Sequence, residues 1–338
     1  MKRNSLIVVL MLSIGAFVMS ACDSQVLSGK PGSSGKTLEL IVVANNQVYN
    51  GRTQMVIDSL FKTPQHALNQ PEPRFDVVHI AALDFDGNSM FQAHRNILKL
   101  EIDPQGLNKV YLEKDKWSLP QVVFRFTAVD QHSLDSMLLI HENRMLREFY
   151  DAEYRRMAKV MKDMPNPSVT RKIKERYGFS LTFSSEFSMD KVQDRFTWVR
   201  KETKDFGIGV LVNTVPHTGA QDLVEAVILE RLDTMMKHYV PGPDEKSYMG
   251  TERRDFFYSR PVKLDDSIDA IETRGLWRLY GGSHMGGPFV CYSFIDPKGA
   301  DVVTLVGYVY SPSYASRSFS KRDLLMQVDG ICRTLSYD

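Results

Sequence analysis

The sequence predicts an α+β fold of two domains, each an antiparallel sheet covered by helices. Three observations point to this class. Short runs of β-branched and apolar residues recur along the chain with the length and composition of strands. Longer segments between them repeat apolar residues at helical spacing. The last three strand-like runs follow one another through short turns such as residues 296–299, which favours antiparallel neighbours over crossover connections.

In the first half of the chain, strands are expected to alternate with helices. Residues 37–44 are short, apolar and rich in β-branched side chains, so we expect a buried strand that opens the fold. Segment 134–162 is rich in the good helix formers Leu, Met, Arg and Glu, and Pro165 and Pro167 end it. The other expected elements are a helix over residues 52–62 and strands over residues 75–80, 96–102 and 121–129.

The break at Pro165 and Pro167 separates a first domain, residues 37–163, from a second, residues 164–338. In the second, Thr218 followed by Gln221 is a capping-box pattern that predicts a helix over residues 219–239. Ser320 followed by Asp323 caps a closing helix in the same way. Strands are expected at residues 179–183, 196–200, 208–214, 271–280, 288–295 and 302–310.

The first 22 residues predict an export signal followed by a lipid anchor. Two basic residues precede the apolar run 6–18, and small residues then lead to Cys22, which is the pattern of a bacterial lipobox. We expect residues 1–21 to be removed and acyl chains on Cys22 to hold the protein on a membrane. A spanning helix is the alternative, but it needs about 20 apolar residues and this run is shorter. Residues 22–36, rich in Gly and Ser, are expected to form a flexible linker.

Composition is that of a globular protein, with 43% hydrophobic and 25% charged residues. Removal of residues 1–21 takes Lys2 and Arg3 from the 42 basic residues and leaves 40 against 41 acidic ones, a net charge of about −1. Binding to nucleic acid needs clustered, uncompensated basic residues, so we expect no nucleic-acid partner.

Two cysteines remain once Cys22 is acylated. Cys291 lies in an apolar strand-like run, and Cys332 lies on the inner face of the closing helix. An envelope compartment permits a disulfide between them, which would stabilise the fold by about 4 kcal/mol in the chain-entropy description. Two buried free thiols are the alternative.

No motif names a reaction or a cofactor. His141 and Glu142 begin like a zinc-protease helix, but the second histidine is missing. Asp84 and Asp86 begin like a calcium loop, but its glycine and closing glutamate are missing. A phosphate-binding glycine loop is also missing, so we expect neither a metal nor a cofactor.

Ser283 and His284 supply the alternative in which the protein is an enzyme. They adjoin in a glycine-rich segment, and an acid brought in by folding would complete the set of a hydrolase acting on envelope polymers. The segment lacks the second glycine of a nucleophile elbow, however, and adjacency in sequence does not create catalytic geometry. Glycines before a strand also serve turns or close packing.

A concentration of aromatic, Met and Arg residues in the second half predicts a contact patch for a ligand or partner. This composition is typical of binding surfaces. Core packing is the alternative use of two of its members, Met249 and Trp277. The candidate residues are Tyr248, Met249, Arg274, Trp277 and His284.

Short segments spread over nearly the whole mature chain carry a family resemblance: PEPRFD at 71–76, HRNIL at 94–98, KWSLPQ at 116–121, RFTW at 195–198, SYMGTERR at 247–254, RGLW at 274–277 and GGPFVCY at 286–292. In these the chain resembles a family of uncharacterised lipoproteins of Bacteroidota envelopes that carry a domain of unknown function. In such envelopes, export to the cell surface is associated with acidic residues just after the lipidated cysteine. The lone Asp23 therefore implies an anchor that faces the periplasm.

The second half is similar in element order to the PsbP-like or Mog1-like α/β/α sandwich, from YGFSLTF at 177–183 to ICRTLSYD at 331–338. Such folds serve mainly as assembly and binding modules, although fold alone does not establish function. The sequence thus predicts a non-enzymatic, lipid-anchored envelope protein that binds a partner protein or envelope polymer through its second domain. An envelope hydrolase using Ser283 and His284 is the alternative.

Overall fold

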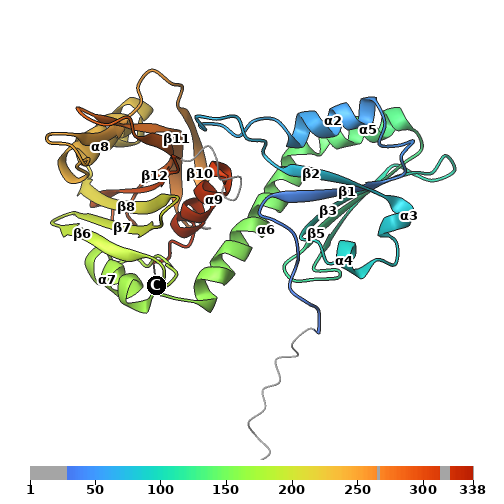
Figure 1. Cartoon of the computed structure of the whole chain (residues 1–338), viewed down its shortest axis with the longest axis horizontal. Helices are drawn as coiled ribbons and strands as arrows, with labels where there is room; N and C mark the ends of the chain where they lie inside the picture. Colours follow the sequence, from blue (N-terminus) through green and yellow to red (C-terminus); the bar gives the residue numbers. More distant parts are fainter. Residues whose placement is uncertain (1–28, 265–266, 313–319, 338) are drawn as a thin grey trace, which may run out of the picture.

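The structure is a computed structural model that describes residues 29–264, 267–312 and 320–337 (Figure 1). The predictions for residues 1–21 and Cys22 lie outside the described residues. The chain forms two α/β units, each around its own sheet, and the predicted α+β class is confirmed. No described helix is both long enough and apolar enough to cross a membrane.

The first sheet has the strand order β2-β1-β3-β5-β4. The predicted antiparallel pairing is wrong here, because β1 pairs in parallel with β2 and β3, and β3 pairs in parallel with β5. Only β4 is antiparallel to its neighbour. The central strands are almost wholly buried, and helices or helical turns cross between them, as parallel sheets require. The strands are β1 (Glu39–Ala44), β2 (Asp76–Ala81), β3 (Asn96–Ile102), β4 (Lys109–Lys114) and β5 (Val122–Ala128).

Helices α2 (Arg52–Phe61), α5 (Gln131–Ile140) and α6 (Glu142–Asp163) belong to the core on one face of this sheet (Figure 1). The short turns α3 (Ala82–Phe85) and α4 (Ser89–Gln92) adjoin the smaller core on the other face. Aromatic rings fill the larger core, with edge-to-face packing of Phe61 on Phe75 and of Phe124 on Phe149.

The single helix predicted over residues 134–162 is two helices that meet at His141. His141 ends α5 and begins α6, so α6 takes its own direction. It leaves the first sheet and runs toward the second domain (Figure 1). This helix therefore belongs to both halves of the molecule.

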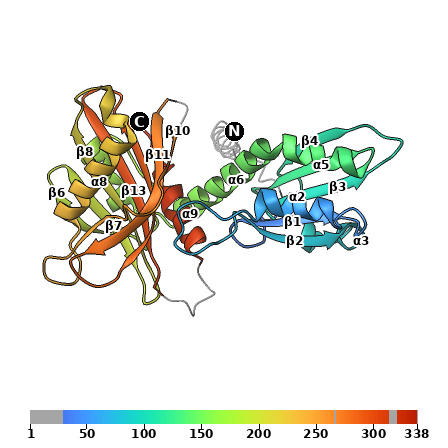
Figure 2. The ribbon, with the colours of Figure 1, turned by 90° about the horizontal axis from the view of Figure 1, so that it is seen from above.

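The second sheet is antiparallel throughout, with the order β10-β11-β12-β13-β8-β7-β6 and β9 beside β11. Helix α8 covers one face and α9 the other (Figure 2), and α7 packs into the same core as α9, which confirms the predicted α/β/α layering. The elements are α7 (Pro167–Tyr177), β6 (Ser188–Gln193), β7 (Phe196–Glu202), β8 (Gly207–Pro216), η1 (Ala220–Leu223), α8 (Glu225–Tyr239), β9 (Tyr248–Thr251), β10 (Tyr258–Lys263), β11 (Asp269–Tyr280), β12 (Gly286–Ile295), β13 (Asp301–Tyr310) and α9 (Lys321–Cys332).

Residues 179–183, predicted as a strand, are an irregular buried segment instead. Phe179, Leu181 and Phe183 are fully buried in the core beneath α7 and α9, so their apolar character reflects packing and not a strand. The predicted cap of the closing helix is confirmed, because the Ser320 hydroxyl accepts from the Asp323 backbone N–H at 3.0 Å.

The end of the expected flexible linker is part of the folded first domain. Leu119 N donates to Pro31 O at 2.9 Å, and Ser33 N donates to Leu119 O at 3.0 Å. Ser34 N donates to Ala93 O at 2.9 Å. Gly35 lies close against the first domain, with a positive φ of 97° and space for no side chain, since a Cβ would lie 2.3 Å from His94 Nε2. Residues 31–36, which we call the seated segment, are thus fixed in place.

The two remaining cysteines are buried free thiols on opposite faces of the second sheet. Cys291 packs under α8, whereas Cys332 packs in the core beneath α7 and α9. A sheet separates the two sulfur atoms, so the structure gives the disulfide alternative no support. Burial raises the pKa of the Cys291 thiol to about 12 and the pKa of Cys332 well above its ordinary value.

We predict that both thiols resist alkylation in the folded protein near pH 8, because burial keeps them protonated and closed to reagent. Both should react fully in denaturant without any reductant, and mass spectrometry would count the adducts. A protein that needs reductant before the thiols react would contain the disulfide after all.

Candidate functional site

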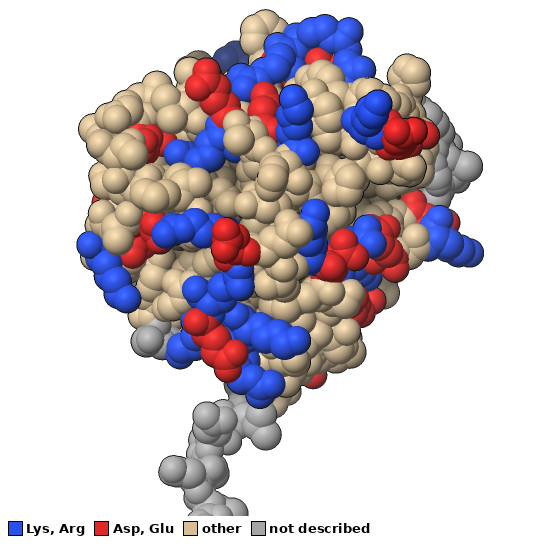
Figure 3. All heavy atoms as spheres, turned by 90° about the vertical axis from the view of Figure 1, so that its left-hand side faces the viewer, with Lys and Arg blue, Asp and Glu red and all other residues tan. Residues whose placement is uncertain are grey.

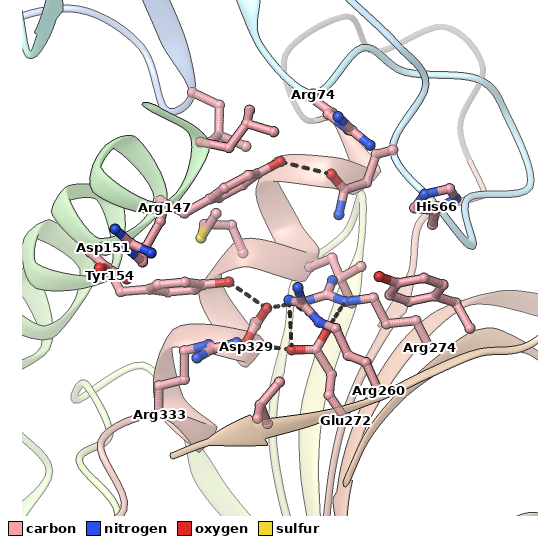
Figure 4. Close-up of a pocket in the computed structure, with 18 of the residues that line it drawn as sticks. His66, Arg74, Arg147, Asp151, Tyr154, Arg260, Glu272, Arg274, Asp329 and Arg333 are labelled. Atoms are coloured by element: carbon pink, nitrogen blue, oxygen red, sulfur yellow. Dashed lines mark hydrogen bonds and ion pairs between the residues drawn. The ribbon is translucent and has the colours of Figure 1, made fainter. Parts of the chain in front are cut away.

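A cavity of about 550 Å³ lies between the two domains and is lined by both. The first domain contributes α6 and the segment around residues 65–74. The second contributes β10, β11 and α9. We call this cavity the interdomain pocket, and Figure 4 shows it in close-up.

Contacts at the start of α9 fix the two domains around the pocket. The Glu72 carboxylate accepts from the backbone N–H groups of Lys321 and Arg322, at 3.0 and 3.1 Å, and so caps the helix from the other domain. The buried Arg322 side chain also reaches the first domain, donating to Pro73 O at 2.8 Å and to Asp76 Oδ2 at 2.9 Å. The start of α9, in the second domain, is therefore bound directly by residues of the first domain.

Two carboxylates and two guanidinium groups form the floor of the pocket, a cluster that we call the acid–arginine cluster. Arg274 Nε donates to Glu272 Oε1 at 2.8 Å, and Arg274 Nη2 donates to Asp329. Arg333 donates to the same two acids, each at 2.9 Å. The Tyr154 hydroxyl of α6 donates to Asp329 at 2.8 Å, which brings the first domain into the cluster. Each guanidinium thus bridges the two acids.

Both acids in this cluster are held ionised. Burial opposes ionisation, but the neighbouring Arg274 keeps the pKa of Glu272 below its ordinary value. Burial acts on Asp329 too, and Arg333 and Arg274 outweigh it and lower the pKa to about 2. Acids that are ionised and fully paired at neutral pH are poor proton donors. The cluster is suited to fixing charges in place and not to general acid catalysis.

The walls above this floor carry cations with weaker partners. Among the described residues, Arg147 forms no hydrogen bond or ion pair, and its side chain is exposed. Arg74 lies 3.5 Å from Glu142, and Arg260, with half of its side chain exposed, lies 3.3 Å from Glu272. Figure 4 shows Arg74 and Arg147 on the first-domain side and Arg260 on the second-domain side.

The pKa of one histidine in the pocket, His66, responds to these cations. Partial burial lowers the pKa of His66, and Arg74, Arg274 and Arg260 lower it further. His66 also stacks on Tyr258 across the domains, with ring centroids 5.0 Å apart. Guanidinium groups present planar, paired donors that match carboxylate and phosphate oxygens. Chemically, the pocket is therefore suited to an anion.

The outer face of the second domain differs from the pocket. Figure 3 shows basic and acidic side chains beside one another on this face, separated by broad uncharged areas. No ligand preference follows from such a surface, because neighbouring opposite charges offset each other.

The predicted contact patch does not form one surface. Arg274 faces α9 in the floor of the pocket, whereas Trp277 and Met249 are buried on the opposite face under α8. The Trp277 indole N–H donates to Val309 O at 3.0 Å, which satisfies it within the fold. Tyr248 stacks on Tyr280. Only Arg274 of the five candidates reaches the interdomain pocket, while Trp277 and His284 both line a second hollow.

The structure also does not assemble the hydrolase set around Ser283 and His284. Ser283 Oγ donates directly to Asp244 Oδ2 at 2.5 Å, so the acid lies on the serine and not on the histidine. Within the described residues, His284 has no hydrogen bond to a serine or a carboxylate, and its side chain is exposed at the rim of a second hollow of about 320 Å³.

Sequence reasoning missed most of the pocket because its residues come from separate elements of both domains. One signal was available. Asp329 interrupts the apolar stripe of the closing helix, between Val328 and Ile331, and Glu272 lies within an otherwise buried strand. Charged residues at core positions need partners, so such positions indicate a buried ion cluster. Groups of acidic, His and Cys side chains that could hold a metal do not occur in the described part of the chain.

Comparison with known families gives two matches. Residues 33–162 match a family described as a domain of unknown function, DUF8532. Residues 166–334, half of the chain, match "Domain of unknown function (DUF4837)". The chain belongs to the DUF4837 family. A search of curated proteins finds no match.

Solved structures similar to part of the chain include the Ran-binding protein Mog1p of Saccharomyces cerevisiae and a point mutant of protein Mog1. Each is 10% identical, covers 47% of this chain and 90% of its own length, and has a TM-score of 0.30. The DUF4837 domain contributes β10, β11 and α9 to the interdomain pocket, and the DUF8532 region contributes α6 and residues 65–74.

We predict that Asp329→Asn lowers the free energy of unfolding by about 3–5 kcal/mol at pH 7, because it leaves Arg274 and Arg333 to share Glu272 as their one remaining acid in the cluster. Urea denaturation would measure the change. Asp163→Asn, which breaks an exposed pair with Lys159, is the matched control and should cost less than about 1 kcal/mol.

The same variant should change the acid response. The lowered pKa of Asp329 stabilises the fold above the unfolded value near 4, and this stabilisation is lost as the pH falls from about 4 toward 2. The wild-type protein should therefore lose stability across that window more steeply than Asp329→Asn. Equal slopes, or a cost at pH 7 no larger than that of the control, would contradict a structural role of the cluster.

Proposed function

We propose that this chain is a lipid-anchored protein of the bacterial cell envelope, of the kind found in Bacteroidota, that binds an anionic envelope component in the interdomain pocket without transforming it. Its anchor is the acylated Cys22, and it faces the periplasm. The lipobox pattern and the lone Asp23 support this cellular location. Acyl chains on one cysteine would hold the protein on a membrane without a spanning helix.

One observation carries the binding function: basic side chains of two domains line one pocket. Arg74 and Arg147 come from the first domain and Arg260 from the second, above a floor whose charges are already paired. A ligand with two anionic groups would bridge the walls and so contact both domains. Ligand pockets form preferentially at domain interfaces for this reason.

The chemistry of the described residues favours binding over catalysis. In the pocket floor, both carboxylates are ionised and shared between guanidinium groups, so neither can serve as a proton donor near pH 7. In the glycine-rich segment of the second domain, Ser283 binds Asp244 directly, with no histidine between them. A hydrolase therefore has no assembled site in support.

We predict that Cys22→Ser removes the protein from the membrane. In cells grown with an alkyne-bearing fatty acid, the wild-type chain should carry the label and sediment with membranes, and the variant should do neither. Cys332→Ser is the matched control and should keep the label. Label retained in Cys22→Ser would disprove the anchor.

We predict that pyrophosphate, used as a probe with two anionic groups, raises the melting temperature of the purified protein. At ten times its dissociation constant it should add about 1.4 kcal/mol, or roughly 2–4 °C, and Arg147→Gln with Arg260→Gln should abolish the rise. The double variant Arg155→Gln with Arg171→Gln removes the same charge outside the pocket and should leave the rise intact. Equal responses of the two double variants would show that binding lies elsewhere.

A further inference from the structure

The proposed anchor at Cys22 would hold the folded chain at a membrane through a short tether. Only eight residues lie between Cys22 and Pro31, where the hydrogen bonds to the first domain begin, so nine Cα–Cα links join the two. A fully extended chain of that length spans about 30 Å, and a flexible one averages about 17 Å. The fold is therefore tied to the lipid surface by a short tether at one defined point.

The seated segment leads within two residues to the wall of the pocket. Leu38, two residues beyond the seated segment, lines the pocket. Figure 1 shows this segment leading into β1 at the end of the first sheet that faces the second domain. The position of the pocket relative to the tether is thus fixed by backbone contacts and not by a free linker.

Helix α6 makes this connection rigid. On one side, Arg156 donates to Arg95 O at 2.7 Å and to Pro120 O at 2.9 Å, in the loops that hold the seated segment. Glu153, fully buried, pairs with Arg95 at 2.9 Å. On another side, Tyr150 and Tyr154 line the pocket. One helix therefore joins the attachment point to the binding site.

We infer that the interdomain pocket takes the anionic, phosphate-bearing headgroup of a membrane lipid. This deepens the proposed function and rests on it. Guanidinium groups on both walls match phosphate oxygens. The short tether raises the local concentration of headgroups at the pocket, whereas a soluble anion gains nothing from it. Exposed Arg147 and half-exposed Arg260 are the expected phosphate contacts.

The test uses the full acylated chain in vesicles of phosphatidylcholine, with or without phosphatidylglycerol, and follows amide hydrogen exchange in α6 and β10. Phosphatidylglycerol should slow exchange at the pocket by about tenfold when its local concentration is ten times the dissociation constant. Arg147→Gln with Arg260→Gln should lose this protection, and Arg155→Gln with Arg171→Gln should keep it. Loss of two charge-assisted hydrogen bonds weakens binding by more than tenfold.

Two further arms identify the source of the phosphate. Glycerol phosphate, added to phosphatidylcholine vesicles at the same bulk concentration, should protect the pocket less than phosphatidylglycerol does. A flexible Gly/Ser insertion between Ser24 and Gln25 should reduce the lipid-dependent protection several-fold, as the effective concentration falls with tether length. Pyrophosphate binding in solution should stay unchanged in this insertion variant.

Equal protection by glycerol phosphate, or no effect of tether length, would show that the ligand is a soluble anion and would overturn the inference while leaving the proposed function standing. Protection lost equally in both double variants would assign it to general charge and overturn it as well. Failure of the proposed function would be a different result: the wild-type protein would not bind pyrophosphate, or it would not carry the fatty-acid label on Cys22.

Discussion

The acid–arginine cluster is the interaction on which the arrangement of the two domains depends. Glu272 on β11 and Asp329 on α9 belong to the second domain, and Tyr154 on α6 reaches them from the first. A buried ion cluster adds little net stability over an apolar core, but losing one member is costly. The effect of the cluster is to fix the relative positions of β11, α9 and α6. Both guanidinium groups and both acids lie in the second domain, and the Tyr154 hydroxyl meets Asp329 because α6 packs against α9, with the pocket between the two domains.

The sequence allowed much of the second domain to be predicted. Strands β11, β12 and β13 are long, apolar and separated by short turns, so local pattern and tertiary structure agree. The first sheet shows where such reasoning fails. Strand β1 was correctly expected to be a buried strand, but its continuous apolar run also indicates burial on both faces, which is typical of parallel sheets. Strand direction depends on the whole connection and not on the strand alone.

The pocket could not be predicted in the same way. Arg274 was selected from sequence, but for its neighbours in the chain, and Trp277 three residues later lies on the opposite face of the sheet. Successive side chains of a strand point to opposite faces of the sheet, so two residues an odd number of positions apart lie on different faces. Glu272 is two positions from Arg274, but its other acid, Asp329, is 55 positions away, and Tyr154, which binds Asp329, is 120 positions away. Partners this far apart in the sequence produce no local pattern from which the cluster could be predicted.

The last helix of the chain also has a consequence for the order of assembly. Met326 on α9 packs in the core of the first domain, and Glu72 caps the start of that helix. During synthesis, the first domain emerges long before α9 exists, so its core lacks a piece and Glu72 lacks a helix to cap. The first half of the chain therefore cannot complete its core without a helix from the second half. The core of the first domain is complete only once α9 has been made and Met326 has packed into it.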